Sequence, residues 1–182
     1  MVAPDKVRIT QAEFKRLLTQ PEYQDRQVEL WDGEIIETMP TWGHGRKAAQ
    51  IIIEIGIYLR SRSIGAPGIE VQIALPGEDY APIPDLCVVR DRKGVIDSDE
   101  ALPFMPDLVV EIQSPDQSDR FMREKGDWYI AHGCRMVIIV YLKPIVEVQT
   151  PTARNLLTID DTLDGGDVLP GFSVAVATLY PQ

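Results

Sequence analysis

The 182-residue sequence predicts an α/β fold in which a mixed β-sheet is flanked by helices. Three observations indicate this class. Short apolar runs typical of strands recur along the second half of the chain, two longer segments have apolar residues at helical spacing, and one of those helices stands between consecutive strands. Because the length is close to the ~150 residues of an average domain, we expect residues 1–182 to fold as one domain.

The N-terminal part of the chain predicts a helix followed by a β-hairpin. Thr10 and Glu13 have the spacing of a capping box, so a short amphipathic helix should begin here and run to about Leu18. Further along, Asp32-Gly33 favours a two-residue type I′ turn, because both positions of that turn need positive φ. The strands joined by this turn are expected at residues 28–31 and 34–39.

The rest of the chain predicts two more helices and a series of strands. After a loop of Pro and Gly at residues 40–45, apolar residues repeat with helical spacing from Arg46 to about Arg62. Another helix is expected from Ser118, a good N-cap residue, to Gly133, a residue type that readily takes the left-handed conformation at helix ends. The expected strands are residues 70–75, 86–90, 107–113, 135–142, 145–149 and 156–159.

The composition is that of a globular protein without a membrane span. Hydrophobic residues make up 45% of the sequence and charged residues 25%, and the longest apolar run, Met136 to Leu142, has only the length of a strand. Residues 1–6 lack the pattern of a secretory signal, so we expect a cytoplasmic protein. Cys87 and Cys134 are isolated in the sequence and are expected to be reduced core residues rather than zinc ligands.

Acidic residues within apolar strands indicate a candidate cation site. In the strand expected at 107–113, side chains alternate between faces, so Glu111 lies among apolar neighbours. Its burial would need a metal, a cation or hydrogen-bond donors nearby, although a Glu that reaches solvent at the strand end is an alternative. Asp85, at the start of another apolar strand, becomes a candidate partner. The net charge of −10 weighs against a basic phosphate-binding surface but not against cation binding.

Lys125 is the most informative residue of the helix expected at 118–133. At 100° per residue, Phe121, Trp128 and Tyr129 define an apolar stripe, and Lys125 falls inside that stripe. Its stem should therefore run towards the sheet. A lysine that merely extends to the edge of the stripe is the alternative, whereas a lysine that meets Glu111 could serve as a charge partner and handle water or a phosphate oxygen.

Several motifs in the chain together resemble the Uma-two family of endonucleases. The resemblance covers nearly all of residues 10–180, and although each motif alone is weakly specific, their shared order makes the assignment strong. The motifs are Glu29 to Glu34, Pro84 to Leu86, Pro106 to Pro115 followed by Glu124, Lys125, Tyr129 and Gly133, and Leu169 to Phe172.

The resemblance implies a restriction-endonuclease-like fold of the PD-(D/E)xK type and a nuclease that uses Mg²⁺ or Mn²⁺ on nucleic acid, most directly DNA. On this chain it implies Asp85 and Glu111 as metal ligands, and the main-chain carbonyl of Ile112 is a further oxygen donor of suitable type. Lys125 would position water or stabilise developing charge. The usual lysine of the superfamily would stand where this sequence has Gln113, which could orient the water.

Two other functions stay open at this level. One is a catalytically silent interaction module of the same fold, favoured by the net charge and by Gln113, and the other is a metal-dependent hydrolase of a small phosphorylated molecule. For His44 we expect a structural role, with a contact to phosphate as the alternative. For Glu29 we expect a solvated strand residue, with a further acidic group of the site as the alternative. Because residues 137–142 and 145–148 are strongly apolar and could leave an exposed sheet edge, we expect a homodimer that covers it.

Overall fold

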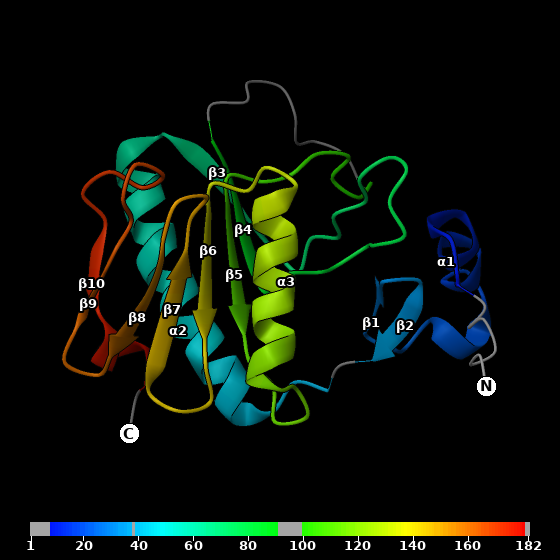
Figure 1. Cartoon of the computed structure of the whole chain (residues 1–182), viewed down its shortest axis with the longest axis horizontal. Helices are drawn as coiled ribbons and strands as arrows, with labels where there is room; N and C mark the ends of the chain where they lie inside the picture. The colour runs from blue at the N-terminus through cyan, green and yellow to red at the C-terminus, as the bar shows by residue number, and fades with distance from the viewer. Residues whose placement is uncertain (1–7, 38, 91–99, 181–182) are drawn as a thin grey trace. The chain divides into compact units, whose positions relative to one another are not determined.

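A computed structural model describes residues 8–37, 39–90 and 100–180 (Figure 1). The chain divides into two compact units. The smaller comprises residues 1–39, 72–83 and 100–104, and the larger comprises residues 40–71, 84–99 and 105–182. Each unit has a cluster of buried hydrophobic residues. The expectation of a single domain stays a prediction.

The smaller unit contains the predicted helix and hairpin. Its elements are α1 (Gln11–Leu17), the 3₁₀ helix η1 (Pro21–Tyr23), β1 (Val28–Trp31) and β2 (Glu34–Glu37). Thr10 and Glu13 form the predicted capping box at the start of α1. Between the antiparallel strands, Asp32 and Gly33 have φ angles of 50° and 71°, the left-handed values that a type I′ turn requires. The hairpin prediction is therefore confirmed up to Glu37, and position 38 lies outside the described residues.

The larger unit is built on a six-stranded sheet with the order β3-β4-β5-β6-β7-β8. Its strands are β3 (Gly65–Ile69), β4 (Leu86–Arg90), β5 (Leu108–Ile112), β6 (Met136–Val140), β7 (Ile145–Gln149) and β8 (Arg154–Thr158). Strands β5 and β6 are parallel and the other neighbouring pairs are antiparallel. A parallel pair needs a crossover connection, which a helix supplies here. The mixed sheet with flanking helices confirms the predicted fold class.

Helix α2 (Trp42–Arg62) begins earlier than the predicted Arg46. The hydroxyl of Thr41 accepts a hydrogen bond of 3.3 Å from the amide of His44, so Thr41 is the N-cap, and the segment predicted as a loop joins the helix. At its other end the helix stops at Ser63, which has a left-handed φ of 53°. The early start places His44 in the first turn of a long helix.

Helix α3 (Asp119–Ala131) is the crossover between β5 and β6 and has the predicted boundaries within a residue or two. The hydroxyl of Ser118 accepts a hydrogen bond of 3.1 Å from the amide of Phe121 and caps the helix. Beyond the helix, Gly133 has a φ of 100°, as expected for its left-handed role. The capping residues therefore define this helix as the sequence predicts.

The two helices cover opposite faces of the sheet, α3 in front and α2 behind in Figure 1. The face towards α2 forms the main hydrophobic cluster, in which Ile51 and Ile55 of the helix meet apolar strand residues such as Val110 and Ile138. Strand alternation turns the neighbouring residues to the other face. There the register places Glu111, Ile139 and Glu147 side by side across β5, β6 and β7. Two acidic residues therefore lie on the face that α3 covers.

The C-terminal segment adds elements that the sequence did not predict. Strands β9 (Thr162–Asp164) and β10 (Ser173–Ala175) pair in antiparallel register, and the 3₁₀ helix η2 (Val176–Leu179) follows them. The hydroxyl of Tyr180 then donates hydrogen bonds to the carbonyls of Tyr141 at 3.0 Å and Ile145 at 2.6 Å. These contacts attach the end of the described chain to the connection between β6 and β7.

Cys87 and Cys134 are buried, unpaired core residues, as predicted. Burial is the main cause that raises the pKa of Cys87 to about 11 and that of Cys134 to about 12. A raised pKa keeps a thiol protonated near neutral pH, as is usual for buried structural cysteines.

Two predictions about the sheet are wrong. The strand expected at 70–75 is replaced by β3, and Ile73 forms only an isolated bridge with Leu102. Because β3 contains Pro67 and two glycines, its pairing with β4 depends on tertiary context rather than on intrinsic strand preference. The prediction that residues 137–142 and 145–148 leave an exposed sheet edge is also wrong. Strands β6 and β7 lie inside the sheet, and its two edge strands are β3 and β8.

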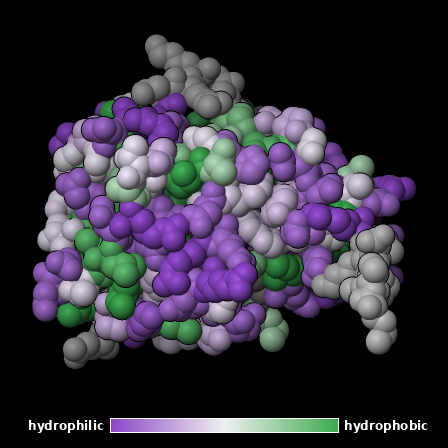
Figure 2. Space-filling model, in the orientation of Figure 1, coloured by the Kyte–Doolittle hydropathy of each residue, from purple (hydrophilic) through white to green (hydrophobic). Residues whose placement is uncertain are grey.

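On the face shown in Figure 2, hydrophobic side chains lie in small groups, and hydrophilic residues separate these groups. Among the described residues, none of the helices is both long enough and apolar enough to cross a membrane. The segment inspected for a secretory signal, residues 1–6, lies outside the described part. The large hydrophobic residues that are exposed are Met39, Trp42, Ile53, Ile57, Ile69, Leu142, Leu156 and Ile159.

Candidate active site

Glu111 of β5 and Lys125 of α3 form a buried ion pair. The Nζ atom of Lys125 is 2.9 Å from Oε1 of Glu111, and the hydroxyl of Tyr129 donates a hydrogen bond of 2.7 Å to the same oxygen. The exposed fractions are 4% for Glu111, 1% for Lys125 and 0% for Tyr129. The prediction that Lys125 points towards the sheet is confirmed. The hydrogen bond of the Tyr129 hydroxyl was not predicted, because the aromatic ring alone explains why Tyr129 lies in the apolar stripe of the helix.

The energetic cost of this pair indicates a role beyond stability. Removing a carboxylate or an ammonium group from water costs several kcal/mol per ion, and their attraction offsets that cost only with good geometry and further hydrogen bonds. Here Tyr129 supplies such a bond. Because apolar residues of similar size usually stabilise a fold at least as well, a buried Lys–Glu pair in an apolar sheet is typical of a functional site.

Asp85 lies next to this pair at the start of β4. The register pairs Leu86 with Val110, so its continuation by one residue places Asp85 opposite Glu111 on the neighbouring strand. The Oδ2 atom of Asp85 accepts a hydrogen bond of 2.6 Å from the amide of Ile112. This bond fixes the carboxylate at the end of β5, close to the carbonyl that the sequence indicated as a metal ligand.

His44 is a residue of this region that sequence reasoning undervalued. Its Nε2 atom is 2.9 Å from Oδ1 of Asp85, and the two side chains are 12% and 18% exposed. Burial lowers the pKa of His44 and the positive charge of Lys47 lowers it further, while the carboxylate of Glu70 opposes these effects. At neutral pH the imidazole is therefore mainly uncharged. The early start of α2 could have been inferred from Thr41, but no sequence signal places His44 beside Asp85.

Glu70 joins the surroundings of Asp85 through its backbone. Its amide donates a hydrogen bond of 3.4 Å to the carbonyl of Asp85, and its φ of 52° lies in the left-handed region. Such a conformation costs a non-glycine residue of the order of 1 kcal/mol and is often found at functional sites. The sequence suggested a regular strand at this position, so the turn of the chain here was not predicted.

Gln113 is buried and its side chain makes several hydrogen bonds within the fold. Its Nε2 atom donates to the carbonyl of Gln117 at 3.0 Å and to Oδ1 of Asp119 at 2.9 Å. Its Oε1 atom accepts a bond of 3.0 Å from the amide of Leu142. Gln113 therefore connects the end of β5 with the start of α3 and with the turn that follows β6.

Glu29 belongs to the smaller unit and differs from its expected solvated state. It is 3% exposed, and its Oε2 atom accepts a hydrogen bond of 3.2 Å from the amide of Ile83. The burial of Glu29 corrects that expectation.

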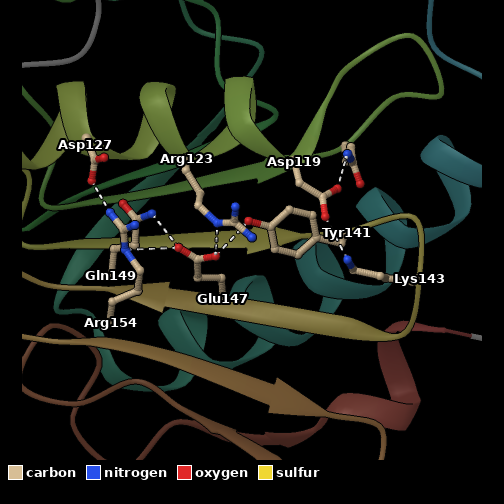
Figure 3. A network of polar contacts seen from close by, with 9 residues as sticks. Asp119, Arg123, Asp127, Tyr141, Lys143, Glu147, Gln149 and Arg154 are labelled. Atoms are coloured by element: carbon tan, nitrogen blue, oxygen red, sulfur yellow. Dashed lines mark hydrogen bonds and ion pairs between the residues drawn. The ribbon is translucent and has the colours of Figure 1, made fainter.

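A second buried carboxylate lies on the α3 face of the larger unit, two strands from Glu111. Glu147 of β7 is 0% exposed and makes contacts through both of its oxygens (Figure 3). Its Oε2 atom is 3.2 Å from Nε of Arg123 and 2.7 Å from the hydroxyl of Tyr141. Its Oε1 atom is 3.2 Å from Nε of Arg154 and 2.8 Å from Nε2 of Gln149.

Arg123 belongs to this cluster although its side chain lies partly at the surface of α3. The exposed fraction of its side chain is 40%, but its guanidinium reaches the buried Glu147. In contrast, Arg120 and Glu124 form an exposed pair, with 2.7 Å between Nε and Oε1. Burial and the hydrogen bond to Glu147 raise the pKa of Tyr141, so its hydroxyl remains a donor at neutral pH.

The donors around Asp85 suit a hard divalent cation in their chemistry. Mg²⁺ is usually held by one or two carboxylates together with waters and substrate oxygens, rather than by a complete protein cage. Asp85, Glu111 and the carbonyl of Ile112 supply oxygen donors at the adjacent ends of β4 and β5. Within residues 8–37, 39–90 and 100–180, no group of three or more His, Cys, Asp and Glu is arranged to hold a metal ion.

The fold and the arrangement of acidic and basic groups define a restriction-endonuclease-like protein. In a comparison with solved structures, the crystal structure of a putative nuclease belonging to DUF820 from Anabaena variabilis matches with a TM-score of 0.79. The match covers 94% of this chain and 97% of that chain at 22% sequence identity. At this identity the comparison establishes the fold.

The sequence then identifies the family. Residues 11–177 match the Uma2 family, described as "Putative restriction endonuclease", and the chain therefore belongs to that family. The resemblance recognised from the sequence motifs is confirmed. A search of curated proteins found no match. Restriction endonucleases, the class that the family description names, act on nucleic acid and generally use a divalent metal.

Proposed function

We propose that the protein is an endonuclease that hydrolyses phosphodiester bonds of nucleic acid, with DNA as its first candidate substrate and Mg²⁺ or Mn²⁺ as its cofactor. The observation that carries this proposal is the buried pair of Lys125 and Glu111, 2.9 Å apart, next to Asp85. Neither a solvated surface nor a packed apolar core accounts for that combination, because both charged groups of the pair are almost fully buried.

The proposed roles follow from the position of each group. Asp85, Glu111 and the carbonyl of Ile112 would hold the cation, which when bound supplies Lewis-acid stabilisation of the phosphate charge. Lys125 holds a positive charge at the site and would stabilise negative charge that develops on the phosphate. Tyr129 fixes the orientation of Glu111 through its hydrogen bond, so it is a positioning residue.

Gln113 takes a positioning role in this proposal. Its hydrogen bonds to the carbonyl of Gln117 and to Asp119 hold the loop that leads into α3. That loop determines where α3 begins, and therefore the position along β5 at which Lys125 meets Glu111. Orientation of the attacking water, the role first considered for Gln113, would require its amide to give up at least one of these bonds.

The proposal is tested by calorimetric titration with Mn²⁺ and Mg²⁺ and by cleavage assays on single- and double-stranded DNA. Wild-type protein should bind the ions and cleave DNA, and both Asp85→Ala and Lys125→Ala should abolish cleavage. Asp85→Ala should weaken Mn²⁺ binding by about tenfold or more, because a ligand is lost. Lys125→Ala should leave binding intact or tighten it, because a competing positive charge is removed.

Two surface variants provide matched controls for these substitutions. Asp25→Ala and Lys15→Ala remove the same side chains from exposed positions of the smaller unit and should retain metal binding and cleavage. Lys125→Met preserves more of the buried volume than Lys125→Ala and guards against loss of folding. Absence of ion binding at millimolar concentration, together with absence of cleavage of either DNA form, would refute the enzyme proposal.

A catalytically silent interaction module is the second candidate function. It is favoured by Gln113, whose hydrogen bonds lie within the fold, and by the net charge of −10, which opposes close approach of a polyanion. Under this alternative the pair of Lys125 and Glu111 would survive as a structural remnant. Metal binding without cleavage of any DNA or RNA substrate is the result that would favour it.

A homodimer also belongs to the proposal, although through a different surface from the one first expected. With β6 and β7 inside the sheet, β8 is an edge strand, and Leu156 on it is 59% exposed. The other edge strand, β3, carries Pro67, which lacks a donor and is typical of protected edges. Sedimentation velocity at micromolar concentration should show a dimer that Leu156→Lys dissociates, and a wild-type monomer would refute this part of the proposal.

A further inference from the structure

The outer face of helix α2, on the side away from the sheet, carries large hydrophobic residues that are exposed. Trp42, Ile53 and Ile57 are 83%, 50% and 53% exposed, whereas Ile51 and Ile55, on the side that packs against the sheet, are 0% exposed. At 100° per residue, the three exposed side chains lie within about 60° of one another around the helix axis. They therefore form one stripe, and an exposed apolar stripe is typical of an interaction surface.

A glycine beside this stripe is not explained by the fold of a single copy. Gly56 lies inside α2, where glycine is less favourable than alanine. A Cβ atom added at this position would meet nothing within 4 Å among the residues that the structure describes. Because glycine allows another group to approach the helix backbone closely, Gly56 indicates a neighbour that is not part of the same chain.

The residues of this face are complementary to the same face of a second copy that runs in the opposite direction. In an antiparallel pair of α2 helices with its two-fold axis at the level of Ile51, residues equally far from Ile51 on either side face each other. Ala49 then faces Ile53, and Gly56 faces Arg46. Each large side chain meets a small residue, which is the arrangement that lets two helices interdigitate.

The same register brings complementary charges together. Trp42 faces Arg60, whose guanidinium suits the face of an indole ring. Arg46 and Glu54 lie on the same side of the stripe, and Glu54 of the second copy comes within about 3 Å of the level of Arg46 along the helix axis. A parallel pair would instead place Arg46 beside Arg46. Charge complementarity therefore favours a second copy in antiparallel orientation.

We propose that the outer face of α2 binds the same face of a second copy in antiparallel orientation. This contact is separate from the edge strand β8, because α2 covers a face of the sheet and β8 forms one of its edges. The face of one helix is smaller than the roughly 800 Å² that each partner contributes to a standard interface, so the contact is weak by itself. It joins copies at higher protein concentration than the contact through β8, and it does not depend on nuclease activity.

Disulfide crosslinking between two cysteine variants tests the register. Trp42→Cys and Arg60→Cys place the new thiols about 27 Å apart along the helix, whereas a disulfide needs Cα atoms within about 7 Å. Neither variant alone can therefore crosslink at the proposed contact. At a protein concentration of about 100 μM, an equimolar mixture of the two should give at least about fivefold more disulfide-linked dimer than either variant alone. The native Cys87 and Cys134 are buried and are present in all three samples.

A charge at the centre of the face provides the second measurement. Ile53→Lys, introduced into both cysteine variants, should reduce the yield of the mixture to that of the single variants. Ile69→Lys is the matched control, because Ile69 is 53% exposed on β3 and its replacement should leave the yield unchanged.

A second pair guards against a cysteine variant that fails to fold. Arg46→Cys and Gly56→Cys lie about 15 Å apart along the helix and face each other in the proposed register. Preferential crosslinking in either mixture, removed by Ile53→Lys, supports the proposal. Equal yields in the single and mixed samples, or no dimer in both mixtures, would overturn it and leave this face to a different kind of partner.

Discussion

Two buried glutamates, Glu111 and Glu147, lie beneath α3, and the charge of each carboxylate must be stabilised away from water. The two glutamates have different partners for this. At Glu111, the ammonium group of Lys125 and the hydroxyl of Tyr129 both contact the oxygen Oε1. Glu147 receives two arginines, a tyrosine hydroxyl and a glutamine, and these contacts are divided between its two oxygens. A buried ammonium group thus faces Glu111, whereas guanidinium groups that are partly exposed face Glu147.

The identity of the cations sharpens this contrast. The guanidinium of arginine is always charged and its planar donors engage carboxylate oxygens in fixed directions, whereas lysine is a compact charge that responds readily to its surroundings. Arg123 and Arg154 also keep 40% and 43% of their side chains exposed, while Lys125 is buried with its partner. The Glu147 cluster therefore extends partly into solvent, whereas the Glu111 pair lies within the protein.

The largest effect on stability should follow from removal of Glu147. Glu147→Ala leaves two guanidinium groups and a tyrosine hydroxyl without their shared acceptor, and we expect a loss of about 3–5 kcal/mol in the free energy of unfolding. Urea denaturation followed by circular dichroism measures this loss. Mn²⁺ affinity measured under native conditions should stay within about twofold of wild type, and a tenfold loss would show that the two glutamates are not separate in function.

The second effect concerns the other glutamate and should appear in metal binding rather than in stability. In a Tyr129→Phe background, which removes the buried hydroxyl that would lose its acceptor, replacement of the pair by apolar residues, Lys125→Met with Glu111→Leu, should change the free energy of unfolding by less than about 1 kcal/mol or increase it. Mn²⁺ affinity should fall by about tenfold or more, because a proposed ligand is lost. A double variant that is strongly destabilised would instead place Glu111 in the structural class with Glu147.

A third, smaller effect tests the packing between α3 and the Glu147 cluster. A Cβ atom added at Gly126 would lie 2.3 Å from Oε1 of Gln149, so Gly126→Ala must displace the amide that bonds to Glu147. The cost of overpacking, about 1–3 kcal/mol, is partly offset by a gain of about 1 kcal/mol in helix propensity. We expect a net loss of about 1 kcal/mol in urea denaturation.

The matched control for this packing test is the same substitution in a Gln149→Ala background. There the new methyl group meets less volume, so Gly126→Ala should be neutral or stabilising relative to that background. Equal losses in both backgrounds would mean that the amide of Gln149 is not the group displaced.

The smallest effect should come from Asp119, which lies between the two glutamate regions. Its hydrogen bond with Lys143 and then that with Gln113 hold the pKa of Asp119 below its ordinary value. A lowered carboxyl pKa in the folded state stabilises the protein above the unfolded pKa of about 4, and this contribution is lost as the pH falls through the folded value.

Asp119→Asn should therefore destabilise the protein by about 0.5 kcal/mol or less at pH 7, because the pair with Lys143 is largely exposed. The difference from wild type should start to shrink near the unfolded pKa of about 4 and go on shrinking as the pH falls through the lowered pKa of the folded state. Urea denaturation at a series of pH values from 7 downward measures the effect. A difference that stays constant below about pH 4 would indicate that the amide has altered the packing at the start of α3.

Much of the candidate site could be predicted from sequence because it depends on local periodicity. The alternation of β5 and the phase of α3 are properties of short segments, and they bring Lys125 towards Glu111 once the helix packs on the strand. The place of Asp85 at the start of an apolar strand was likewise visible. None of these inferences requires knowledge of the order of strands in the sheet.

The features that sequence reasoning missed depend on that order or on local strain. Arg123 meets Glu147 because β7 lies two strands from β5, and the apolar runs of β6 and β7 do not tell interior strands from edge strands. His44 meets Asp85 only when the start of α2 is placed against the end of β4. At Glu70, the left-handed backbone angle has no sequence signal, since glutamate does not favour it.

The parallel pairing of β5 and β6 has a consequence for the order in which the site forms. The hydrogen bond from Tyr129 to Glu111 spans 18 residues and lies within one strand–helix–strand unit, whereas the bond from Ile112 to Asp85 spans 27 residues and requires another strand. Closure of shorter loops costs less chain entropy and leads to faster folding. The contact between α3 and Glu111 should therefore form first during folding. Pairing of β4 with β5 then brings Asp85 to the site.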